Sequence, residues 1–380
     1  MELLRLGVLG RSAKENESRL AIHPGQFDRI DEDVRAHMVL ERGYGLRYGV
    51  SDARLEPMVA GFASREEVIA TTDVVLMPKP TRSDVAELAD GQVLWGWPHM
   101  VQDRELTQLA IDKRLTVIAW EAMNVWSSSG QFVVHVFHQN NELAGYASVF
   151  HALALTGSTG HYGRALRAAV LGFGNTARGA VTGLQAIGVH DVTVMTAREV
   201  AQVASPMPAA VLRNVYRSED DPDIIMVETP DGSVEVAVFL ADFDIVVNCV
   251  LQDTDSPQMF VRDSDLPLFA PGSLFVDVSC DAGMGFEFAR PTSFSDPMFT
   301  VGDGVNYYGV DHSPAYFWNS ATWGISEALI PYLRTVMGGP ADWDRDETIT
   351  RAIEIRDGVL RNPKILSFQG RAADHPHGFL

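Results

Sequence analysis

The sequence predicts an α/β protein with parallel sheets, divided into two domains. Apolar segments of strand length alternate with amphipathic segments of helix length along most of the chain, which is typical of parallel sheets covered by helices. A chain of 380 residues is long enough for two domains of roughly 100–200 residues each. The composition, with 46% hydrophobic and 21% charged residues, is that of a globular protein.

The first third of the chain contains the first group of alternating segments. The predicted strands are residues 5–10, 38–41, 73–77, 93–97 and 115–120, with 132–137 as one more candidate, and the predicted helices are 24–32, 65–70 and 103–113. Residues 140–155 contain no proline and are rich in Ala and Leu, which predicts a long buried helix. The turn-rich stretch 156–163 follows, and a domain boundary is expected in this region.

A second alternating group begins at Ala168. Its predicted strands are 168–173, 191–196, 243–250, 273–279 and one near 298–301, and a helix with an acidic surface loop is expected over 199–221. The segments 224–228 and 234–239 flank an Asp-Gly turn, which is typical of a β-hairpin. A second long helix is expected over 320–336, and a further helix starts within 344–348.

The motif with the clearest chemistry is Gly172-Phe-Gly-Asn-Thr-Ala177, which lies between a predicted strand and a predicted helix. Gly172 permits the tight turn, and Gly174 has no side chain to keep a pyrophosphate from the backbone. Ala177 permits close packing of the helix on the strand. The free N–H groups at Asn175 and Thr176 would then face the phosphates. The motif predicts dinucleotide binding, with an ordinary structural turn as the alternative.

The end of the next strand distinguishes the two nicotinamide cofactors. An acidic residue there accepts hydrogen bonds from the ribose of NAD, whereas small polar or basic residues accommodate the 2′-phosphate of NADP. The chain has Thr196 and Arg198 at this place and no acid before Glu199. We therefore expect NADPH rather than NADH, with Thr196 and Arg198 at the 2′-phosphate. The alternative is that Arg198 is simply an exposed strand-end residue.

Charge and composition argue against several classes of protein. The net charge of −20 and the lack of a Lys/Arg cluster disfavour a nucleic-acid or anionic membrane partner. The chain starts without the features of a signal peptide and has no apolar run of membrane-spanning length, so a cytoplasmic protein is expected. Cys249 and Cys280 lie in apolar runs and are expected to be buried thiols in a reducing compartment. No metal site is predicted, because His135 and His138 would point to opposite faces of a strand.

Taken together and in order, these and further segments resemble the alanine dehydrogenase/saccharopine dehydrogenase superfamily, most closely the N5-(carboxyethyl)ornithine synthases and the lysine-forming saccharopine dehydrogenases. The segments that carry the resemblance are Glu17-Ser-Arg-Leu-Ala-Ile-His-Pro24, Leu76-Met-Pro-Lys79, Gly96-Trp-Pro-His99, Ala144-Gly-Tyr-Ala147, Gly172 to Ala180, Asn248-Cys249, Val276 to Gly283 and Val310-Asp-His-Ser-Pro314. The resemblance implies two Rossmann-like, doubly wound domains around a cleft. A discontinuous substrate domain, 1–140 plus 318–380, would accompany a nucleotide-binding domain, 141–317.

The resemblance also implies a reaction and a set of site residues. The reaction is reversible hydride transfer to an imine formed from a 2-oxo acid and an amine. Lys79 and His99, at the ends of neighbouring strands, would be the acid–base couple, and substrate contacts are implied for Arg19, Glu121 and Asp311. Cofactor contacts are suggested for Cys249, Val250, Asp277 and Asp281. From the residues alone, each of these side chains could equally be an ordinary strand-end or surface group.

Several functions stay open at this point. The first is an NADPH-dependent opine-type dehydrogenase that joins a small 2-oxo acid to the side-chain amine of a basic amino acid. The alternatives are a saccharopine dehydrogenase, a relative that cleaves another N-substituted amino acid, an alanine dehydrogenase, and a non-catalytic NADP(H)-sensing protein. Pro80 follows Lys79 where saccharopine dehydrogenase carries an acid, which weakens that particular reading.

Overall fold

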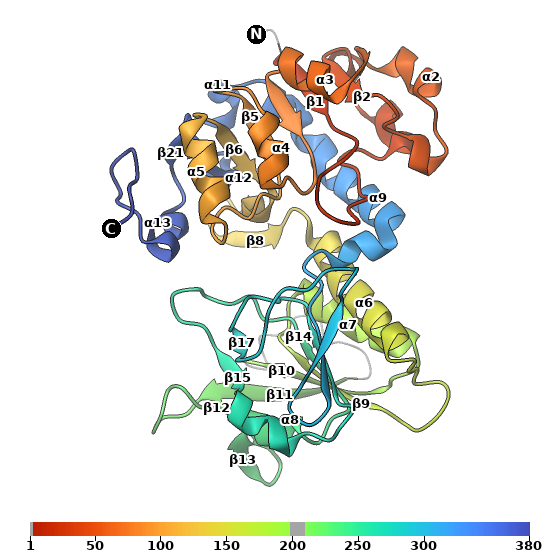
Figure 1. Cartoon of the computed structure of the whole chain (residues 1–380), viewed down its shortest axis with the longest axis vertical. Helices are drawn as coiled ribbons and strands as arrows, with labels where there is room; N and C mark the ends of the chain where they lie inside the picture. Colours follow the sequence, from red (N-terminus) through yellow and green to blue (C-terminus); the bar gives the residue numbers. More distant parts are fainter. Residues whose placement is uncertain (1–2, 198–209) are drawn as a thin grey trace. The chain divides into compact units, whose positions relative to one another are not determined.

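The computed structural model describes residues 3–197 and 210–380. It contains two compact units (Figure 1): unit 1 is formed by residues 1–138 and 318–380, and unit 2 by residues 139–317. The turn-rich stretch 156–163 lies inside unit 2.

Unit 1 is built on an eight-stranded sheet with the order β21-β20-β6-β5-β4-β1-β2-β3. The six strands from β6 to β3 are parallel, and their order is 3-2-1-4-5-6 when read from the β3 edge, as in doubly wound nucleotide-binding folds. The C-terminal segment adds β20 and β21 in antiparallel orientation. The strands are β1 (Leu6–Val8), β2 (Met38–Glu41), β3 (Gly61–Ala63), β4 (Val74–Leu76), β5 (Val93–Gly96), β6 (Thr116–Ala119), β20 (Ile353–Arg356) and β21 (Val359–Leu360).

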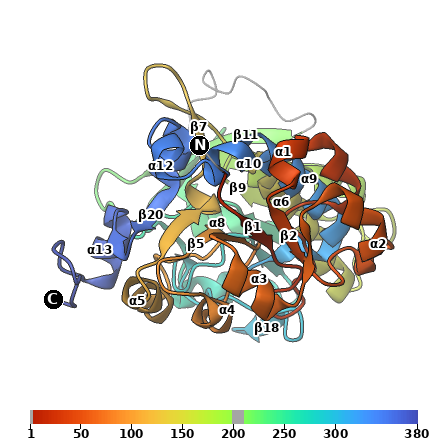
Figure 2. The same cartoon turned by 90° about the horizontal axis from the view of Figure 1, so that it is seen from above.

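Helices cover both faces of this sheet because neighbouring residues of each strand point to opposite sides. In β4, Val74 and Leu76 join one apolar core and Val75 joins the other. The two helical layers lie on opposite sides of the strands in Figure 2. One layer contains α3 (Arg65–Thr71), α4 (Arg82–Glu87) and α5 (Arg104–Asp112), and the other contains α9 (Trp318–Leu329), α10 (Leu333–Met337), α11 (Pro340–Trp343) and α12 (Glu347–Ala352). The remaining helices of unit 1 are α1 (Glu32–Arg35), α2 (Asp52–Leu55) and α13 (Pro363–Gln369).

Unit 2 contains a nine-stranded sheet with the order β13-β12-β11-β10-β9-β14-β16-β19-β18. Its six parallel strands, β11 to β19, again have the order 3-2-1-4-5-6. The strands are β9 (Arg167–Leu171), β10 (Asp191–Thr196), β11 (Ala210–Arg217), β12 (Ile225–Thr229), β13 (Gly232–Glu235), β14 (Ile245–Asn248), β16 (Leu274–Asp277), β18 (Met298–Val301) and β19 (Val305–Tyr308). Helices α6 (His138–Leu155) and α7 (Asn175–Ala186) pack on one face, while α8 (Val236–Leu240) and the small sheet of β15 (Met259–Val261) and β17 (Gly285–Phe286) pack on the other.

The predicted fold class, two Rossmann-like doubly wound domains with a discontinuous first domain, is confirmed by this topology. No helix among the described residues is both long enough and apolar enough to cross a membrane.

Several of the expected elements differ in the structure, among them the helix expected over 24–32, which is a 3-10 helix (Pro24–Arg29). Residues 210–217 form β11 rather than a helix, and the backbone of β11 pairs with β10 and β12. Residues 198–209 lie outside the described part. The expected strand 234–239 ends at Glu235, where the continuous apolar run begins α8; such a run does not distinguish strand from helix. The long helix over 320–336 is interrupted at Pro331, which lies in a 3-10 helix (Ile330–Tyr332).

The candidate strand 132–137 does not join the parallel sheet. It forms β8 (Phe132–His135), which pairs with β7 (Asn124–Trp126) as a separate antiparallel hairpin. The sequence did not predict the strands β3, β7, β15, β17, β19, β20 and β21.

Candidate active site

The glycine loop of unit 2 connects β9 to α7 at the point where the strand order reverses between β9 and β14. Gly172 has φ +102°, a backbone conformation that side chains disfavour, and a Cβ there would also lie 3.1 Å from the Cys249 carbonyl oxygen. Gly174 is the N-cap of α7 and supplies no side-chain cap to the helix. A Cβ on Gly174 would meet no described atom within 4 Å. Open space therefore faces the free N–H groups at Asn175, Thr176 and Ala177, which fits a pyrophosphate.

Helix α7 is held against α6 by glycines that the sequence motif alone does not explain. A Cβ on Gly179 would lie only 1.7 Å from the carbonyl oxygen of Glu142, and one on Gly145 would lie 2.0 Å from that of Thr176. The two backbones therefore touch directly. This contact fixes the direction of α7, and with it the direction of the N–H groups at its first turn.

The strand end that distinguishes NADP from NAD lies partly within the described residues. Thr196 ends β10 and is 5% exposed. Arg198, expected at the 2′-phosphate, lies outside the described residues.

Asp277 ends β16 and is entirely buried. Its Oδ1 accepts hydrogen bonds from Asn248 Nδ2 (3.0 Å) and Cys280 N (2.9 Å), and its Oδ2 accepts one from the Tyr307 hydroxyl (3.0 Å). Burial raises the pKa of Asp277 to about 7, although these hydrogen bonds oppose the shift. Asp277 thus holds the loop after β16 through these hydrogen bonds, and its contact with a cofactor stays a prediction.

Asp281, four residues further on, is only half-buried, and burial raises the pKa of its carboxyl. Cys249 is buried and its N–H donates to the Leu171 carbonyl (2.9 Å). Burial also raises the pKa of the Cys249 thiol, so this group is a packing residue and a poor nucleophile. The N–H of Val250 donates to Asn248 Oδ1 (3.1 Å). These residues form the strand-end surface next to the glycine loop.

Asp311 lies in the loop after β19. Its Oδ1 is 2.6 Å from Nδ1 of the buried His312, and about a quarter of its side chain is exposed (26%). The partner ring fixes one carboxylate oxygen of Asp311.

In unit 1, three of the expected site residues follow three neighbouring parallel strands. Lys79 follows β4, His99 follows β5 and Glu121 follows β6 in the 3-10 helix Trp120–Ala122. Because the carboxyl ends of parallel strands meet at one edge, the sheet brings these side chains to the same edge, where open α/β sheets bind their ligands. Burial raises the pKa of Glu121 more than the positive charge of Lys79 lowers it.

His99 has an unusual backbone. Its φ is +51°, in the left-handed region, and its N–H donates to Glu121 Oε1 (2.7 Å). The ring Nδ1 is 4.0 Å from the same oxygen, and 45% of the side chain is exposed. Residues held in this region cost on the order of 1–2 kcal/mol and gather at functional sites. The strand end therefore keeps an exposed imidazole next to a carboxyl group at an energetic cost.

Glu121 faces a second acid that sequence reasoning missed. About a quarter of its side chain is exposed (24%), but Oε2 is buried without a hydrogen-bond partner. Glu354 of β20 is 3% exposed, and its Oε2 is likewise buried without a partner, while Oε1 accepts from Asn362 Nδ2 (2.8 Å). Burial and the neighbouring carboxyl of Glu354 raise the pKa of Glu121, and burial raises the pKa of Glu354. The two acids therefore favour a protonated, uncharged form.

Arg19 lies in the segment after β1 and is 5% exposed. Its guanidinium pairs with Glu17 through Nε–Oε1 (2.8 Å) and Nη2–Oε2 (2.5 Å), and it lies over the Trp97 ring at 5.5 Å. Glu17 was part of a matching segment but was not expected as a partner. A substrate carboxylate at Arg19 would bind to a guanidinium that is already oriented by one carboxylate.

No group of three or more His, Cys, Asp and Glu side chains within residues 3–197 and 210–380 is placed to hold a metal ion. The expected residues gather instead in two sets, the glycine-loop edge of unit 2 and the strand-end edge of unit 1. These features define a class of protein: a dinucleotide-dependent dehydrogenase built from two Rossmann-like units.

Comparison with known proteins identifies the family within this class. The chain belongs to the alanine dehydrogenase/PNT family: the N-terminal domain model matches residues 9–143 and the C-terminal domain model matches residues 153–363. The chain is 25% identical over 324 residues to the N(5)-(carboxyethyl)ornithine synthase of Clostridium botulinum, covering 83% of this chain and 89% of that one. It is 24% identical to the alanine dehydrogenase of Mycobacterium tuberculosis, covering 99% of this chain and 100% of that one.

Solved structures show the same fold. An L-alanine dehydrogenase superposes with a TM-score of 0.73 at 19% identity, covering 96% of this chain and 99% of that one. A transhydrogenase from Sinorhizobium meliloti gives a TM-score of 0.67 at 20% identity, covering 94% and 99%. The predicted superfamily and the predicted class, an NAD(P)-dependent oxidoreductase of amino-acid metabolism, are confirmed by the family.

Proposed function

We propose that this protein is an NADPH-dependent opine-type dehydrogenase. Its reaction joins the side-chain amine of a basic amino acid to a small 2-oxo acid, with loss of water to give an imine. Hydride addition to the imine carbon and protonation of nitrogen then give a secondary amine, and the reverse reaction consumes water. The family includes dehydrogenases with different substrates, and a basic amino acid with a small 2-oxo acid is the pair proposed for this protein.

This reaction requires proton donors and acceptors, and side chains of these kinds follow the strands of unit 1. Loss of water from the carbinolamine needs a proton donor, and formation of the imine needs a proton acceptor, roles for which Lys79 and His99 are the candidates. The exposed imidazole of His99 lies against Glu121, whose raised pKa favours a protonated carboxyl. Arg19 is the candidate cation for a substrate carboxylate, with Asp311 of unit 2 as a further substrate contact.

The cofactor would be held by unit 2. When bound, NADPH supplies the hydride, and the N–H groups of Asn175 to Ala177 together with Gly172 and Gly174 would carry its pyrophosphate. Cys249, Val250 and Asp281 are candidates for contacts near the strand ends. The preference for NADPH rests on Thr196 and Arg198 in place of an acid at the end of β10.

One observation carries the proposal: Lys79, His99 and Glu121 follow consecutive neighbouring strands of one parallel sheet in a chain similar to an N(5)-(carboxyethyl)ornithine synthase. Proton-transfer groups and a carboxyl of raised pKa at one sheet edge suit imine chemistry. A sheet edge with no proton-transfer side chains would suit only a nucleotide-binding function.

The test is a substrate panel in which loss of NADPH is followed. Lysine, ornithine and other amines are each combined with pyruvate, 2-oxoglutarate or glyoxylate, and NADH replaces NADPH in parallel. We expect turnover with a basic amino acid plus a 2-oxo acid, faster with NADPH. If no combination of amine and 2-oxo acid is turned over but NADPH binds tightly, a sensing protein is favoured instead.

A second candidate is alanine dehydrogenase. It is favoured by the relative from Mycobacterium tuberculosis, which aligns over 100% of its length with this chain. Ammonia and pyruvate would then suffice for loss of the reduced cofactor, and alanine would release ammonia in reverse. The same panel separates the two functions when ammonia is added as one of the amines.

A further inference from the structure

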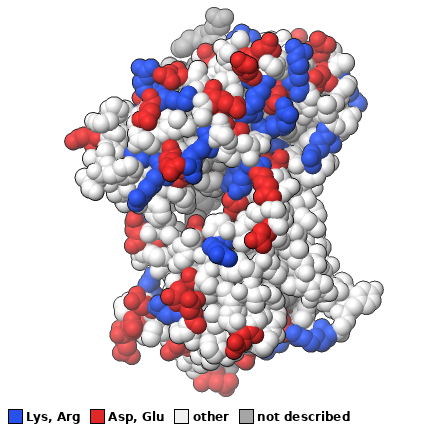
Figure 3. Space-filling view, in the orientation of Figure 1, with Lys and Arg blue, Asp and Glu red and all other residues white. Residues whose placement is uncertain are grey.

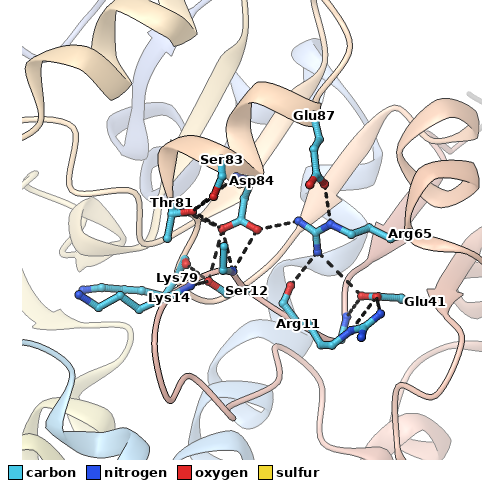
Figure 4. A network of polar contacts seen from close by, with 12 residues as sticks. Arg11, Ser12, Lys14, Glu41, Arg65, Lys79, Thr81, Ser83, Asp84 and Glu87 are labelled. Atoms are coloured by element: carbon cyan, nitrogen blue, oxygen red, sulfur yellow. Dashed lines mark hydrogen bonds and ion pairs between the residues drawn. The ribbon is translucent and has the colours of Figure 1, made fainter. Parts of the chain in front are cut away.

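A polar network in unit 1 joins the segment after β1 to the segment that carries Lys79. Figure 4 shows its centre, the carboxylate of Asp84 in the first turn of α4. Asp84 is 3% exposed. It accepts hydrogen bonds from Thr81 N (2.8 Å) and Thr81 Oγ1 (2.8 Å), and from Ala13 N at 3.1 Å to each oxygen. Arg65 Nη2 completes the set at 2.7 Å.

Helix capping explains only part of this arrangement. Thr81 and Asp84 form a capping box, which satisfies the first N–H groups of α4. A capping box needs neither the N–H of Ala13, which lies in the segment after β1, nor an ion pair with Arg65. The additional donors indicate that Asp84 also fixes the position of the segment around Ala13.

Ser12 makes the link to Lys79 direct. Its hydroxyl donates to the carbonyl oxygen of Lys79 and accepts the N–H of Lys14 (3.0 Å). The same hydroxyl lies 3.5 Å from Asp84 Oδ2. One side chain therefore bridges the backbones of the two segments, which follow the neighbouring strands β1 and β4.

The charges around Asp84 are balanced within the network. Arg65 also bonds the Arg11 carbonyl oxygen through Nη1 (2.8 Å) and pairs with Glu87 through Nε (2.5 Å). Arg65 is 20% exposed and Asp84 3%, whereas Glu87 is 48% exposed. The Arg65–Asp84 pair is thus the inner part of the network, and the Glu87 contact is a surface ion pair of small energetic weight.

We propose that Ser12 and Asp84 are positioning residues for Lys79: together they hold the backbone of Lys79 against the segment after β1 and thereby fix where its ammonium group can reach. The inference rests on the proposed function in one respect: that function assigns proton transfer to Lys79. Proton transfer requires hydrogen-bond reach, and a misplacement of about 1 Å can cost roughly 100-fold in rate.

The test compares two pairs of matched variants. Ser12→Ala removes the hydroxyl that bridges the two segments, and Ser83→Ala removes a hydroxyl that contacts Thr81 (2.8 Å). Asp84→Asn places an NH₂ group opposite the donors of Thr81, Ala13 and Arg65. Its control, Glu87→Gln, removes the negative charge that pairs with Arg65 at the surface. We expect Ser12→Ala to lower kcat about tenfold and Asp84→Asn to lower it further, with the KM for NADPH unchanged. Both controls should keep wild-type kcat.

A second readout does not depend on turnover. The chain contains only four lysines, Lys14, Lys79, Lys113 and Lys364. Reductive ¹³C-methylation of their amines therefore gives few NMR signals. The signal that disappears in the Lys79→Arg variant is that of Lys79. We expect the Lys79 signal to move in Ser12→Ala and in Asp84→Asn but to stay in place in the two controls.

An unchanged Lys79 signal together with unchanged kcat in Ser12→Ala would overturn the inference, whether or not Asp84→Asn folds. Failure of the proposed function looks different. If Lys79→Met keeps normal turnover, Lys79 has no role in catalysis, while the NMR signal still decides whether Ser12 positions it.

Discussion

At the scale of single residues, His99 combines an unfavourable backbone with an exposed reactive ring. Its φ of +51° is disfavoured for most side chains, but asparagine tolerates this region well. We expect His99→Asn to change the free energy of unfolding by less than about 1 kcal/mol. The same variant should lower kcat about 100-fold or more, which is the usual contribution of an acid–base group.

Thermal unfolding and steady-state kinetics measure the two effects separately. His99→Leu is the comparison, because a branched apolar side chain at positive φ should destabilise the protein as well as inactivate it. Near-normal turnover of His99→Asn would remove His99 from the acid–base couple.

Asp277 allows a pH prediction with a definite sign. Its pKa is raised to about 7 in the folded protein, mainly by burial, against an ordinary value of 3.8. The folded protein therefore holds a proton that the unfolded chain releases between these two values. The stability from this group is complete below about pH 4 and is lost as the pH rises through 7, by about 1.4 kcal/mol per pH unit.

Asp277→Asn cannot ionise, and its amide can keep an acceptor toward Cys280. We expect the free energy of unfolding of this variant, relative to that of the wild type, to improve steadily between pH 4 and pH 7 and then to level off. Urea titrations at several pH values measure the difference. Parallel stability curves for the two proteins would show that Asp277 is already ionised at low pH.

At the scale of elements, two glycines at the start of α7 have different roles: Gly179 permits the contact with α6, and Gly174 leaves space for a ligand. A Cβ on Gly179 would lie 1.7 Å from a backbone oxygen, whereas one on Gly174 would meet nothing within 4 Å. We expect Gly179→Ala to destabilise the protein by about 1–3 kcal/mol, because two helices must move apart. Gly174→Ala should leave the Tm unchanged and weaken NADPH binding.

Differential scanning calorimetry and fluorescence titration with NADPH measure these outcomes. The two substitutions are chemically identical and only five positions apart, so each controls the other. A Gly174→Ala variant that binds NADPH normally would place the pyrophosphate elsewhere.

The strand β20 carries Glu354 at an irregularity in its pairing with β6. Ile353 and Ile355 pair with the adjacent residues Ile118 and Val117, so Glu354 is the extra residue of a β-bulge. We expect Glu354→Gln to lower the pKa of Glu121, because the neighbouring negative charge is removed. The limb of the pH–kcat profile that reports Glu121 should then move to lower pH.

The surface acid Glu347, which pairs with Arg351, provides the control: Glu347→Gln should leave the profile in place. If Glu354→Gln gives the wild-type profile, the two carboxyl groups do not influence each other in the working enzyme.

At the scale of the whole molecule, local patterns predict the two parallel sheets and the glycine loop well. The turn at Gly172 and the polar residues after β4, β5 and β6 are local features, because strand, turn and side chain are contiguous in sequence. Strand β20 pairs with β6 across more than two hundred residues, so no local pattern places it beside β6. Strands β20 and β21 pair with each other around the Asp357-Gly358 turn, a local hairpin signal that was missed. The position of Glu354 beside β6 depends on the long-range pairing and could not be predicted locally.

Charge also acts at this scale. Acidic and basic side chains are intermingled on the face of unit 1 that Figure 3 shows, even though the chain as a whole carries a net charge of −20. Lysine is rare, and Arg65, Arg19 and Arg11 form the ion pairs near the strand ends. Arginine suits these places because its planar fork holds carboxylates in fixed geometry.

The return of residues 318–380 to unit 1 has a consequence for how the protein is made. On the ribosome, every residue of unit 2 is synthesised before the strand that bears Glu354 exists. Unit 2, with the glycine loop, can therefore fold first, while unit 1, with the candidate acid–base residues, waits for the last-translated segment. Premature termination shortly before Ile353 would yield a chain that retains the glycine loop but lacks an edge of its other sheet.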